Sequence, residues 1–349
     1  MIRKIAYGLI VALTGAGLAA EYLLHAPPLV VFSLTGLALI GLAWLLSEST
    51  ESLGHHTGPR IGGILNATLG NAAELIVGIF ALAAGLTTVV KASIIGSVLS
   101  NTLLVMGTGV LLGGLKHGEQ TFSGVLARAN ATMLALAAIG LSVPTIFATE
   151  QAGGAQSTEY LSITVGVILF VAYILLLVFY FTNPAASSTG AEQEGNPPFG
   201  RTSSFALLAV SGAAVGWVSE VFVGTIEPVI KEIGMSELFV GLILIPIVGN
   251  AAEHATAVAI AYKNNMDFSM FISIGSSLQV ALMVTSILVF VGPLLGNPLR
   301  LTFSILELGA LAGAVVVAGL ISLDGKSNWL EGVMLCGVYL IIAAGFFFI

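Results

Sequence analysis

The pentapeptide Gly-Asn-Ala-Ala-Glu occurs twice in this chain, at residues 70–74 and 249–253. The offset of 179 residues that superimposes the two copies also places Gly96 on Gly275 and Ser97 on Ser276. A second short motif, Gly-Ser-x-Leu, therefore follows each pentapeptide at the same distance. Agreement of two motifs at one offset indicates an internal repeat, so the fold is expected to be built from two related halves.

Both copies of the pentapeptide lie inside long apolar runs. The chain is 57% hydrophobic and 8% charged, with a mean hydropathy of +1.03, whereas soluble domains carry about 25% charged residues. The apolar stretches are continuous rather than alternating over about ten residues, which favours helices over a transmembrane β-barrel. We therefore predict an all-α polytopic membrane protein.

Apolar length and breaker residues predict eleven transmembrane helices. They are expected near residues 5–24, 28–48, 61–86, 89–114, 123–148, 158–182, 203–226, 237–262, 267–293, 300–322 and 328–348. The first segment follows Arg3 and Lys4 as a signal peptide would, but no clear cleavage site precedes a soluble domain, so it is interpreted as a membrane helix. The single cysteine, Cys336, offers no disulfide.

A polar linker at residues 183–202 divides the chain. It separates a first repeat at 28–182 from a second at 203–349, and residues 1–27 form an N-terminal helix outside the symmetry. Each repeat holds five predicted helices. Because five is odd, the second repeat enters the membrane from the opposite side. Such inverted repeats are characteristic of secondary transporters with a site near the bilayer midplane.

The basic residues predict the orientation, because they concentrate in cytoplasmic loops. With a cytoplasmic N-terminus, eight of the 11 Lys and Arg residues fall inside and three outside. The inside group is Arg3, Lys4, Arg60, Lys116, Arg128, Arg201, Lys263 and Lys326; the outside group is Lys91, Lys231 and Arg300. We therefore expect a cytoplasmic N-terminus and linker and an external C-terminus. The net charge of -7, without a long basic run, does not suggest a nucleic-acid partner.

Inserting a carboxylate into a membrane helix costs about 2.5–3.5 kcal/mol on insertion scales. Two carboxylates in identical pentapeptides therefore indicate a shared function. In each motif the Asn and the Glu are three residues apart and share one helix face, and the preceding Gly lets backbone or ligand come close. The predicted metal site comprises Glu74, Glu253, Asn71, Asn250, Gly70 and Gly249. Oxygen donors without thiolates suit calcium, which takes about six to eight oxygen ligands. The alternative is that each Glu only holds the bundle together through an interhelical hydrogen bond.

Other polar residues in apolar segments are candidates for a supporting role. They are Asn66, Ser97, Asn101, Ser276, Gln279 and Glu220. Those on the helix after each motif could complete the cation shell or orient its carboxylates; the alternative is ordinary polar helix packing. Asn66 is expected to line the same cavity. Glu220, the approximate counterpart of Glu48, is a candidate for a cation or proton pathway.

Four histidine and glutamate positions break the symmetry of the repeat or lie near a helix end. His254 follows Glu253 where the first copy has Leu75, so it is a candidate for proton coupling beside the two glutamates; the alternative is a packed, hydrogen-bonded core histidine. Glu48, Glu51 and His55 lie near the cytoplasmic end of the second helix. They are candidates for guiding cations inward, and the alternative is a solvated helix end.

No enzyme motif is present. The sequence contains neither HExxH nor GxxxxGK[ST], so neither zinc proteolysis nor ATP hydrolysis is supported. We expect no cofactor, with a cation as transported substrate.

Residues 62–74, GGILNATLGNAAE, and residues 249–254, GNAAEH, resemble the paired signature motifs of the calcium/proton exchanger (CAX) family of the cation/calcium exchanger superfamily. The resemblance extends through both Gly-Ser segments and the eleven-helix layout, and so covers nearly the whole chain. Sodium/calcium exchangers of the superfamily typically carry a Gly-Thr-Ser-x-Pro-Glu motif instead, which this chain lacks.

The resemblance implies roles for individual residues. Glu74 and Glu253 match the family's calcium-binding and proton-exchanging glutamates, and Asn71 and Asn250 match its supporting shell. Ser97, Ser276 and Gln279 match polar positions beside the site. Some members carry a strongly acidic segment between the halves. Here Glu192 and Glu194 are the only acids of the linker, so a strong calcium-concentrating role is not expected there.

The expected function is exchange of cytoplasmic calcium for external protons by alternating access, in the plasma (inner) membrane of a prokaryote. The alternatives are a sodium-coupled or broad-specificity divalent-cation exchanger on the same fold, and a passive cation channel. The expected partners are calcium, protons and the lipid bilayer; the oligomeric state is left open.

Overall fold

The computed structural model describes residues 2–150, 154–183 and 197–349. Most of the predicted linker, including Glu192 and Glu194, lies outside the described residues. The described chain is almost entirely helical, as the apolar runs predict. Its strands are two residues each, β1 (Gln120–Thr121) and β2 (Lys326–Ser327), and they pair antiparallel.

Within the described residues, nine helical segments are long and apolar enough to cross a membrane. They are α1 (Ile2–Tyr22), α2 (Pro28–Thr57), α3 (Pro59–Leu69) with α4 (Ala72–Ala83), α5 (Thr87–Leu99) with η1 (Ser100–Val105) and α6 (Met106–His117), α7 (Gly124–Thr149), α8 (Gly154–Thr182), α10 (Arg201–Ile233), α14 (Met266–Leu278) with η3 (Gln279–Val284), α15 (Thr285–Val291) and η4 (Gly292–Leu295), and α17 (Trp329–Phe347).

Two further segments complete the chain. The first consists of α11 (Glu237–Phe239), η2 (Val240–Leu244) and α12 (Ile245–Gly249), followed by α13 (Ala251–Tyr262) at an angle of 61°. The second is α16 (Ile305–Ile321), which has only 17 residues. Each of the eleven predicted segments thus contains helix. The structure supports nine or ten crossings by length and composition, so eleven crossings stay a prediction.

Some predicted boundaries are wrong. The second helix does not end at residue 48 but continues to Thr57, because its polar C-terminal residues still form helix. The helix expected from residue 300 begins only at Ile305, where Ser304 and Glu307 form a capping box. The all-α prediction also did not include the short β1–β2 pair.

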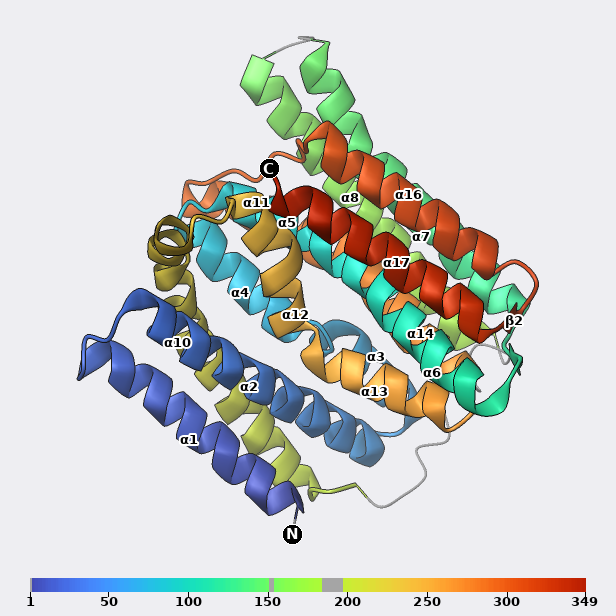
Figure 1. The fold of residues 1–349 in the computed structure, drawn as a ribbon, viewed down its shortest axis with the longest axis horizontal. Coiled ribbons are helices and arrows are strands. Elements are labelled where there is room, and N and C mark those ends of the chain that lie inside the picture. The colour runs from blue at the N-terminus through green and yellow to red at the C-terminus, as the bar shows by residue number, and fades with distance from the viewer. Residues whose placement is uncertain (1, 151–153, 184–196) are drawn as a thin grey trace.

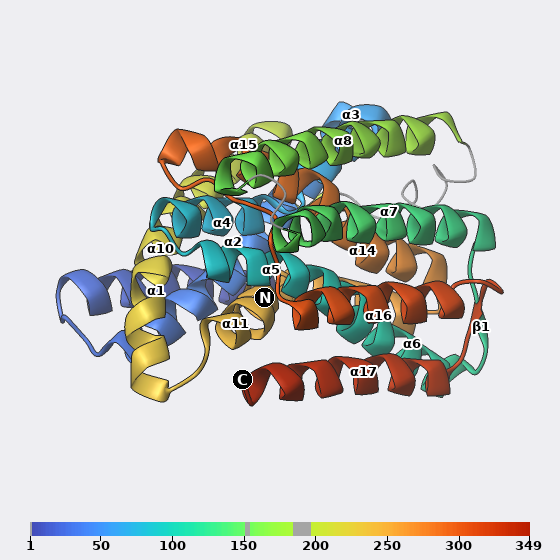
Figure 2. The same cartoon turned by 90° about the horizontal axis from the view of Figure 1, so that it is seen from above.

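The helices form a bundle with α5–α6 and α14–α15 at its centre. The best membrane window of Thr87–His117 is 83% buried and that of Met266–Leu295 is 61% buried, whereas the other windows are between 17% and 44% buried. α1, α2 and α10 lie on one side of this centre and α7, α8, α16 and α17 on the other (Figures 1 and 2). The N-terminus and C-terminus lie at opposite edges of the bundle (Figure 1).

The central helices carry matched irregularities. η1 at Ser100–Val105 and η3 at Gln279–Val284 are π-helical, and the offset of 179 residues places one on the other. Single π-helical turns are uncommon and occur often at functional sites. Their agreement in position is consistent with the predicted repeat and draws attention to the residues around them.

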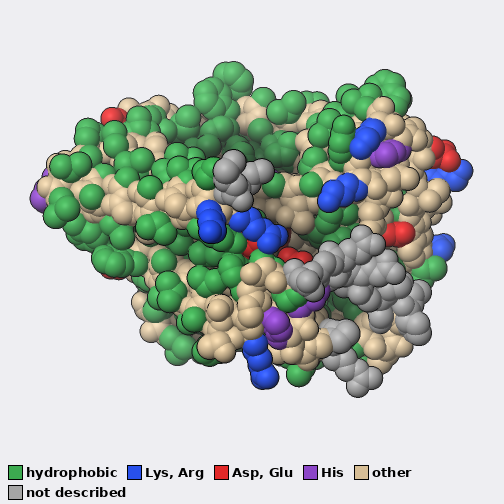
Figure 3. Space-filling model, turned by 90° about the horizontal axis from the view of Figure 1, so that it is seen from below, with side chains coloured by type: hydrophobic (Ala, Val, Ile, Leu, Met, Phe, Trp, Pro, Cys, Tyr) green, Lys and Arg blue, Asp and Glu red, His purple; other side chains and the backbone are tan. Residues whose placement is uncertain are grey.

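The predicted cytoplasmic loops lie together at one end of the bundle. Lys116 Nζ donates to the Tyr262 carbonyl at 3.1 Å, and Lys326 Nζ lies 2.8 Å from Glu119 Oε1. Figure 3, which views the molecule from below, shows hydrophobic side chains over the flank, with Lys, Arg and His side chains gathered toward the middle and one edge. Exposed apolar flanks of this kind suit contact with lipid.

Candidate functional site

Both helices that carry the repeated motif are interrupted inside it. α3 ends at Leu69 and α4 begins at Ala72, while α12 ends at Gly249 and α13 begins at Ala251. Asn71 and Asn250 occupy the N-cap positions, with φ/ψ of -102°/29° and -94°/5°. Glu74 and Glu253 therefore lie in the first turn of a helix, where free N–H groups and the helix dipole favour negative charge.

Asn71 and Asn250 join the interrupted helices to the central ones. Both side chains are fully buried. Ser276 Oγ donates to Asn71 Oδ1 at 3.0 Å, and Asn250 Nδ2 donates to Ser97 Oγ at 3.1 Å. The offset of 179 residues relates these two hydrogen bonds to each other. Each motif is thus tied to the Gly-Ser segment of the other half of the chain.

The hydrogen-bond network extends further on the Ser276 side. Asn101 Nδ2 donates to Ser276 Oγ at 2.9 Å, and Asn71 Nδ2 donates to Gln279 Oε1. The structure therefore brings together four of the six predicted supporting residues around the two asparagines. Buried polar networks of this kind fix one arrangement of the chain when their members are satisfied.

The side chain of Glu74 reaches across to the other motif. A Cβ atom at Gly249 would lie 3.2 Å from Glu74 Cγ and 3.6 Å from its Cδ, so the carboxylate of one motif rests against the glycine of the other. A Cβ atom at Gly70 would lie 3.4 Å from Gln279 Oε1. Larger residues at these glycines would displace the groups that form the site.

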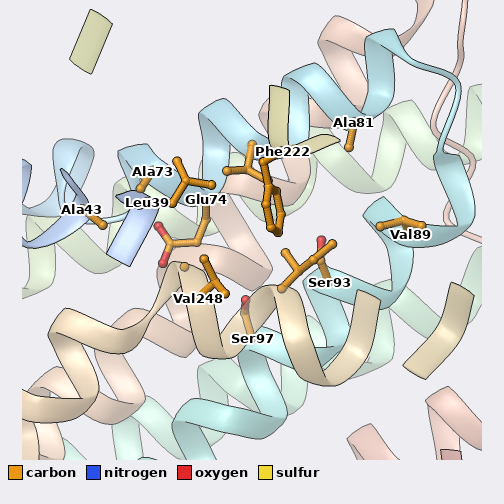
Figure 4. Close-up of a pocket in the computed structure, with 14 residues that line it drawn as sticks. Leu39, Ala43, Ala73, Glu74, Ala81, Val89, Ser93, Ser97, Phe222 and Val248 are labelled. Atoms are coloured by element: carbon orange, nitrogen blue, oxygen red, sulfur yellow. The ribbon is translucent and has the colours of Figure 1, made fainter. Parts of the chain in front are cut away.

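A cavity opens beside Glu74 between α2, α4, α5, α10 and α12. Figure 4 shows the Glu74 carboxylate on the side of α12 near Val248, with Ser97, Ser93 and Phe222 around the same space. Ser93 was not predicted, although it lies one helical turn before Ser97. The remaining lining is mostly apolar, and Glu253 does not line this cavity.

His254 has a partner on the central helix. Its Nε2 lies 3.2 Å from Ser100 Oγ, at the start of η1. This contact is the hydrogen bond expected of a packed histidine, and it leaves proton coupling as a prediction.

Two predicted supporting residues lie elsewhere. Glu220 is exposed and does not line the cavity. It is two residues from Phe222, which does line the cavity, so the helical period turns Glu220 to the opposite face of α10. Asn66 is also exposed on α3 and does not line the cavity, because five residues do not return to the face of Asn71.

The residues predicted to guide cations lie at the end of α2, and the structure does not group them with the paired glutamates. Glu48 accepts a hydrogen bond from Tyr7 Oη at 2.9 Å and lies 3.5 Å from Arg3 Nε. Both partners belong to α1, so Glu48 holds α1 to α2. Glu51 is exposed and His55 is partly buried.

Among the described residues, no group of three or more His, Cys, Asp or Glu side chains is placed to hold a metal ion. A cation at Glu74 and Glu253 would therefore need amide, hydroxyl or carbonyl oxygens as further ligands. Asn250 Oδ1 and Glu253 Oε2 are buried acceptors without a hydrogen-bond partner in the described part of the chain. Such acceptors are available to a ligand.

These features define a helical membrane protein with two interrupted helices and paired internal glutamates, an architecture typical of secondary transporters. The family model described as sodium/calcium exchanger protein matches residues 27–182 and 203–348, and the chain belongs to this family.

Similar proteins agree with this assignment. The chain is 41% identical to a Ca(2+)/H(+) antiporter of Aphanothece halophytica over 93% of this chain and 92% of the relative. It is 42% identical to the Ca(2+)/H(+) antiporter ChaA of Bacillus subtilis over 93% of this chain and 94% of the relative. The solved structure of native YfkE is 38% identical, has a TM-score of 0.86, and covers 99% of this chain and 100% of that one. The predicted family resemblance is confirmed, and the relatives are transporters rather than enzymes.

The Asn–Ser network predicts a difference between two neighbouring serines. Ser276→Ala would leave Asn71 Oδ1 and Asn101 Nδ2 without their partner, which costs about 2 kcal/mol in a buried site. Ser277 is equally buried but donates only to the Ser273 carbonyl of its own helix, at 3.1 Å, so Ser277→Ala should cost about 1 kcal/mol or less. Thermal unfolding of the purified protein in detergent, followed by tryptophan fluorescence, measures both. Equal losses would contradict the special role of Ser276.

Proposed function

We propose that this chain is a secondary active transporter that exchanges calcium for protons by alternating access around Glu74 and Glu253. The observation that carries the proposal is that two interrupted helices each hold a glutamate in a first helical turn, with Glu74 resting against Gly249 of the other motif. Family membership and the names of the antiporter relatives support the same function.

The exchange follows from charge balance. Two ionised carboxylates close together in a low-dielectric interior repel each other and lack hydration, so the empty ionised site is costly. One divalent cation neutralises the pair, and two protons do so equally well. Calcium and protons compete for the same carboxylate oxygens. The site therefore changes its accessibility from one side of the membrane to the other only when it holds one calcium ion or two protons. With the proton-motive force directed inward, calcium leaves the cytoplasm.

Calcium fits the donor set better than a softer metal. The site supplies carboxylate, amide and hydroxyl oxygens, and the buried acceptors Asn250 Oδ1 and Glu253 Oε2 lack partners among the described residues. Calcium accepts an irregular shell of about six to eight oxygens. Gly249 keeps the backbone near the Glu74 carboxylate, and Gly70 keeps it near Gln279 Oε1, a further oxygen donor.

Two related glycines support alternating access. A Cβ atom at Gly96 would collide with the Leu242 carbonyl, because η2 packs directly on α5. Gly275 occupies the related position on α14 and is buried, but a Cβ atom there would have nothing within 4 Å outside its own helix. α3, the counterpart of η2 and α12, packs on α2 instead. η2 and α12 thus cover the central helix in one half, whereas α3 leaves it uncovered in the other. We take the covered half as closed and the uncovered half as open, as in a carrier accessible from one side.

The open half belongs to the predicted cytoplasmic end. α3 starts directly after α2 ends at Thr57, and the basic residues place that connection inside. The same bias supports a cytoplasmic N-terminus. We infer residence in the plasma (inner) membrane of a prokaryote, because relatives in Bacillus subtilis and Aphanothece halophytica each match 93% of the chain.

Reconstitution in liposomes tests the exchange. With a pH gradient and no sodium, calcium movement should be accompanied by opposite proton movement, followed together with a calcium dye and a pH dye. Calcium uptake without proton release would contradict the exchange and favour a channel. A requirement for sodium would favour the sodium-coupled alternative, and equal transport of several divalent cations the broad-specificity one.

Removing either carboxylate should stop exchange. Glu74→Gln and Glu253→Gln each leave a site that cannot balance a divalent cation or exchange two protons, so the exchange rate should fall by at least about tenfold, the factor that 1.4 kcal/mol represents. Glu227→Gln is the matched control, since Glu227 is exposed and pairs with Lys231 one turn away. Wild-type exchange in either site variant would remove that glutamate from the mechanism.

The asymmetry of the glycines predicts a transport defect without a folding defect. Gly275→Ala adds a methyl group where the described state has space, so the protein should fold normally. If α3 must pack there as η2 packs on Gly96, the methyl group obstructs closure by about 1–3 kcal/mol, the cost of overpacking. Calcium binding in detergent should persist while the exchange rate in liposomes falls about 5- to 100-fold. Wild-type exchange would exclude closure at Gly275.

A further inference from the structure

Tyr173 makes a buried hydrogen bond that has no part in the exchange mechanism proposed above. It lies on α8, is 2% exposed, and its hydroxyl donates to the Ala67 carbonyl of α3 at 2.6 Å. A second contact lies two turns along α8, where a Cβ atom at Gly63 would be 2.9 Å from the Phe181 ring. α8 therefore holds α3 at two points.

The Ala67 carbonyl needs such a partner because α3 ends two residues later. Carbonyls in the last turn of a helix have no intrahelical donor, and an unpaired carbonyl inside a membrane is costly. In the second motif, the related Pro246 carbonyl accepts from the Asn250 N–H at 2.9 Å and from Asn250 Nδ2 at 3.0 Å. Asn71 Nδ2 instead donates to Gln279. The two motifs thus satisfy equivalent carbonyls with different donors.

The difference in donors coincides with the difference in packing. Where Asn250 satisfies the carbonyl, η2 and α12 pack on α5 and cover Gly96. Where Tyr173 satisfies it, α3 lies on α2 and α8, and a Cβ atom at Gly275 would have nothing within 4 Å outside its own helix. The Tyr173 bond therefore belongs to the open arrangement.

We propose that Tyr173 is a positioning residue that holds α3 in the cytoplasm-open state, and that closure of α3 toward Gly275 exchanges the Tyr173 hydroxyl for Asn71 as the donor to Ala67. This inference rests on the proposed alternating access. Asn71 is the donor in the closed state because Asn250 already performs that role in the closed half.

The test compares two tyrosines of the same helix. Tyr173→Phe keeps the ring and removes the bond to α3, whereas Tyr180→Phe removes a hydroxyl that donates to Asn130 of α7 at 2.5 Å. Spin labels at Ile64→Cys on α3 and Leu175→Cys on α8, both exposed positions, in a Cys336→Ser background, report the separation of the two helices in full-length protein by pulsed electron resonance.

The short label separation reports the open arrangement, in which α3 lies against α8, and the long separation reports the closed one. Tyr173→Phe should lower the ratio of the short-distance to the long-distance population by about three- to tenfold, the range expected for one buried hydrogen bond. Tyr180→Phe should leave the ratio unchanged. The apparent KM for calcium on the cytoplasmic side should rise by a similar factor, because a smaller fraction of the protein is competent to bind, and the maximal rate should not fall. If Tyr173→Phe folds poorly, Phe181→Ala removes the second contact and should shift the ratio in the same direction.

An unchanged ratio in Tyr173→Phe would overturn the role of Tyr173, and so would a single distance that responds to neither calcium nor pH in the wild-type chain. Neither result affects exchange measured in liposomes. Conversely, a chain whose distances shift as expected but which moves calcium without protons would refute the proposed exchange and leave the role of Tyr173 standing.

Discussion

The reciprocal hydrogen bonds between Asn71 and Ser276 and between Asn250 and Ser97 are the interaction on which the arrangement depends. Each joins an interrupted helix of one half to a central helix of the other. A membrane offers no water to satisfy broken helix ends, so interruptions survive only where protein groups replace it. Because the bonds run in both directions, neither motif can move away from the centre without disturbing a partner from the other half.

The glutamates gain their position from these breaks rather than from their own contacts. Each lies in a first helical turn that exists only because the preceding helix stops four or five residues earlier. The free N–H groups and the helix dipole at that turn reduce the cost of a charge that lipid would otherwise exclude. Gly249 then allows the Glu74 carboxylate to lie against the opposite motif. Local backbone geometry thus produces a pair of charges from two distant segments.

Many of the helical segments and motif residues were predictable from the sequence, because the motifs occur in both halves of the chain. Length and hydropathy located eleven helical segments, and the repeat identified Asn71, Glu74, Asn250, Glu253 and the serines that bind the asparagines. The position of Glu220 outside the cavity could not be predicted, because an apolar setting does not reveal which helix face a residue occupies, and α10 turns it away from Phe222. Glu48 was interpreted without Arg3 and Tyr7, since the packing of α1 on α2 leaves no periodic signal.

The unequal packing around Gly96 and Gly275 could not be predicted, because they are the same residue in the same motif. The difference lies in which segments pack on each glycine, and this depends on tertiary structure. The sequence does hold a cause for unequal halves: the offset that pairs Gly96 with Gly275 also pairs Ser100 with Gln279 and Leu75 with His254. Gln279 binds Asn71, whereas Ser100 binds His254. If the proposed alternating access exchanges the packing of the two halves, these contacts would not be reproduced, and we therefore expect the two states to differ in free energy even with the site equally occupied.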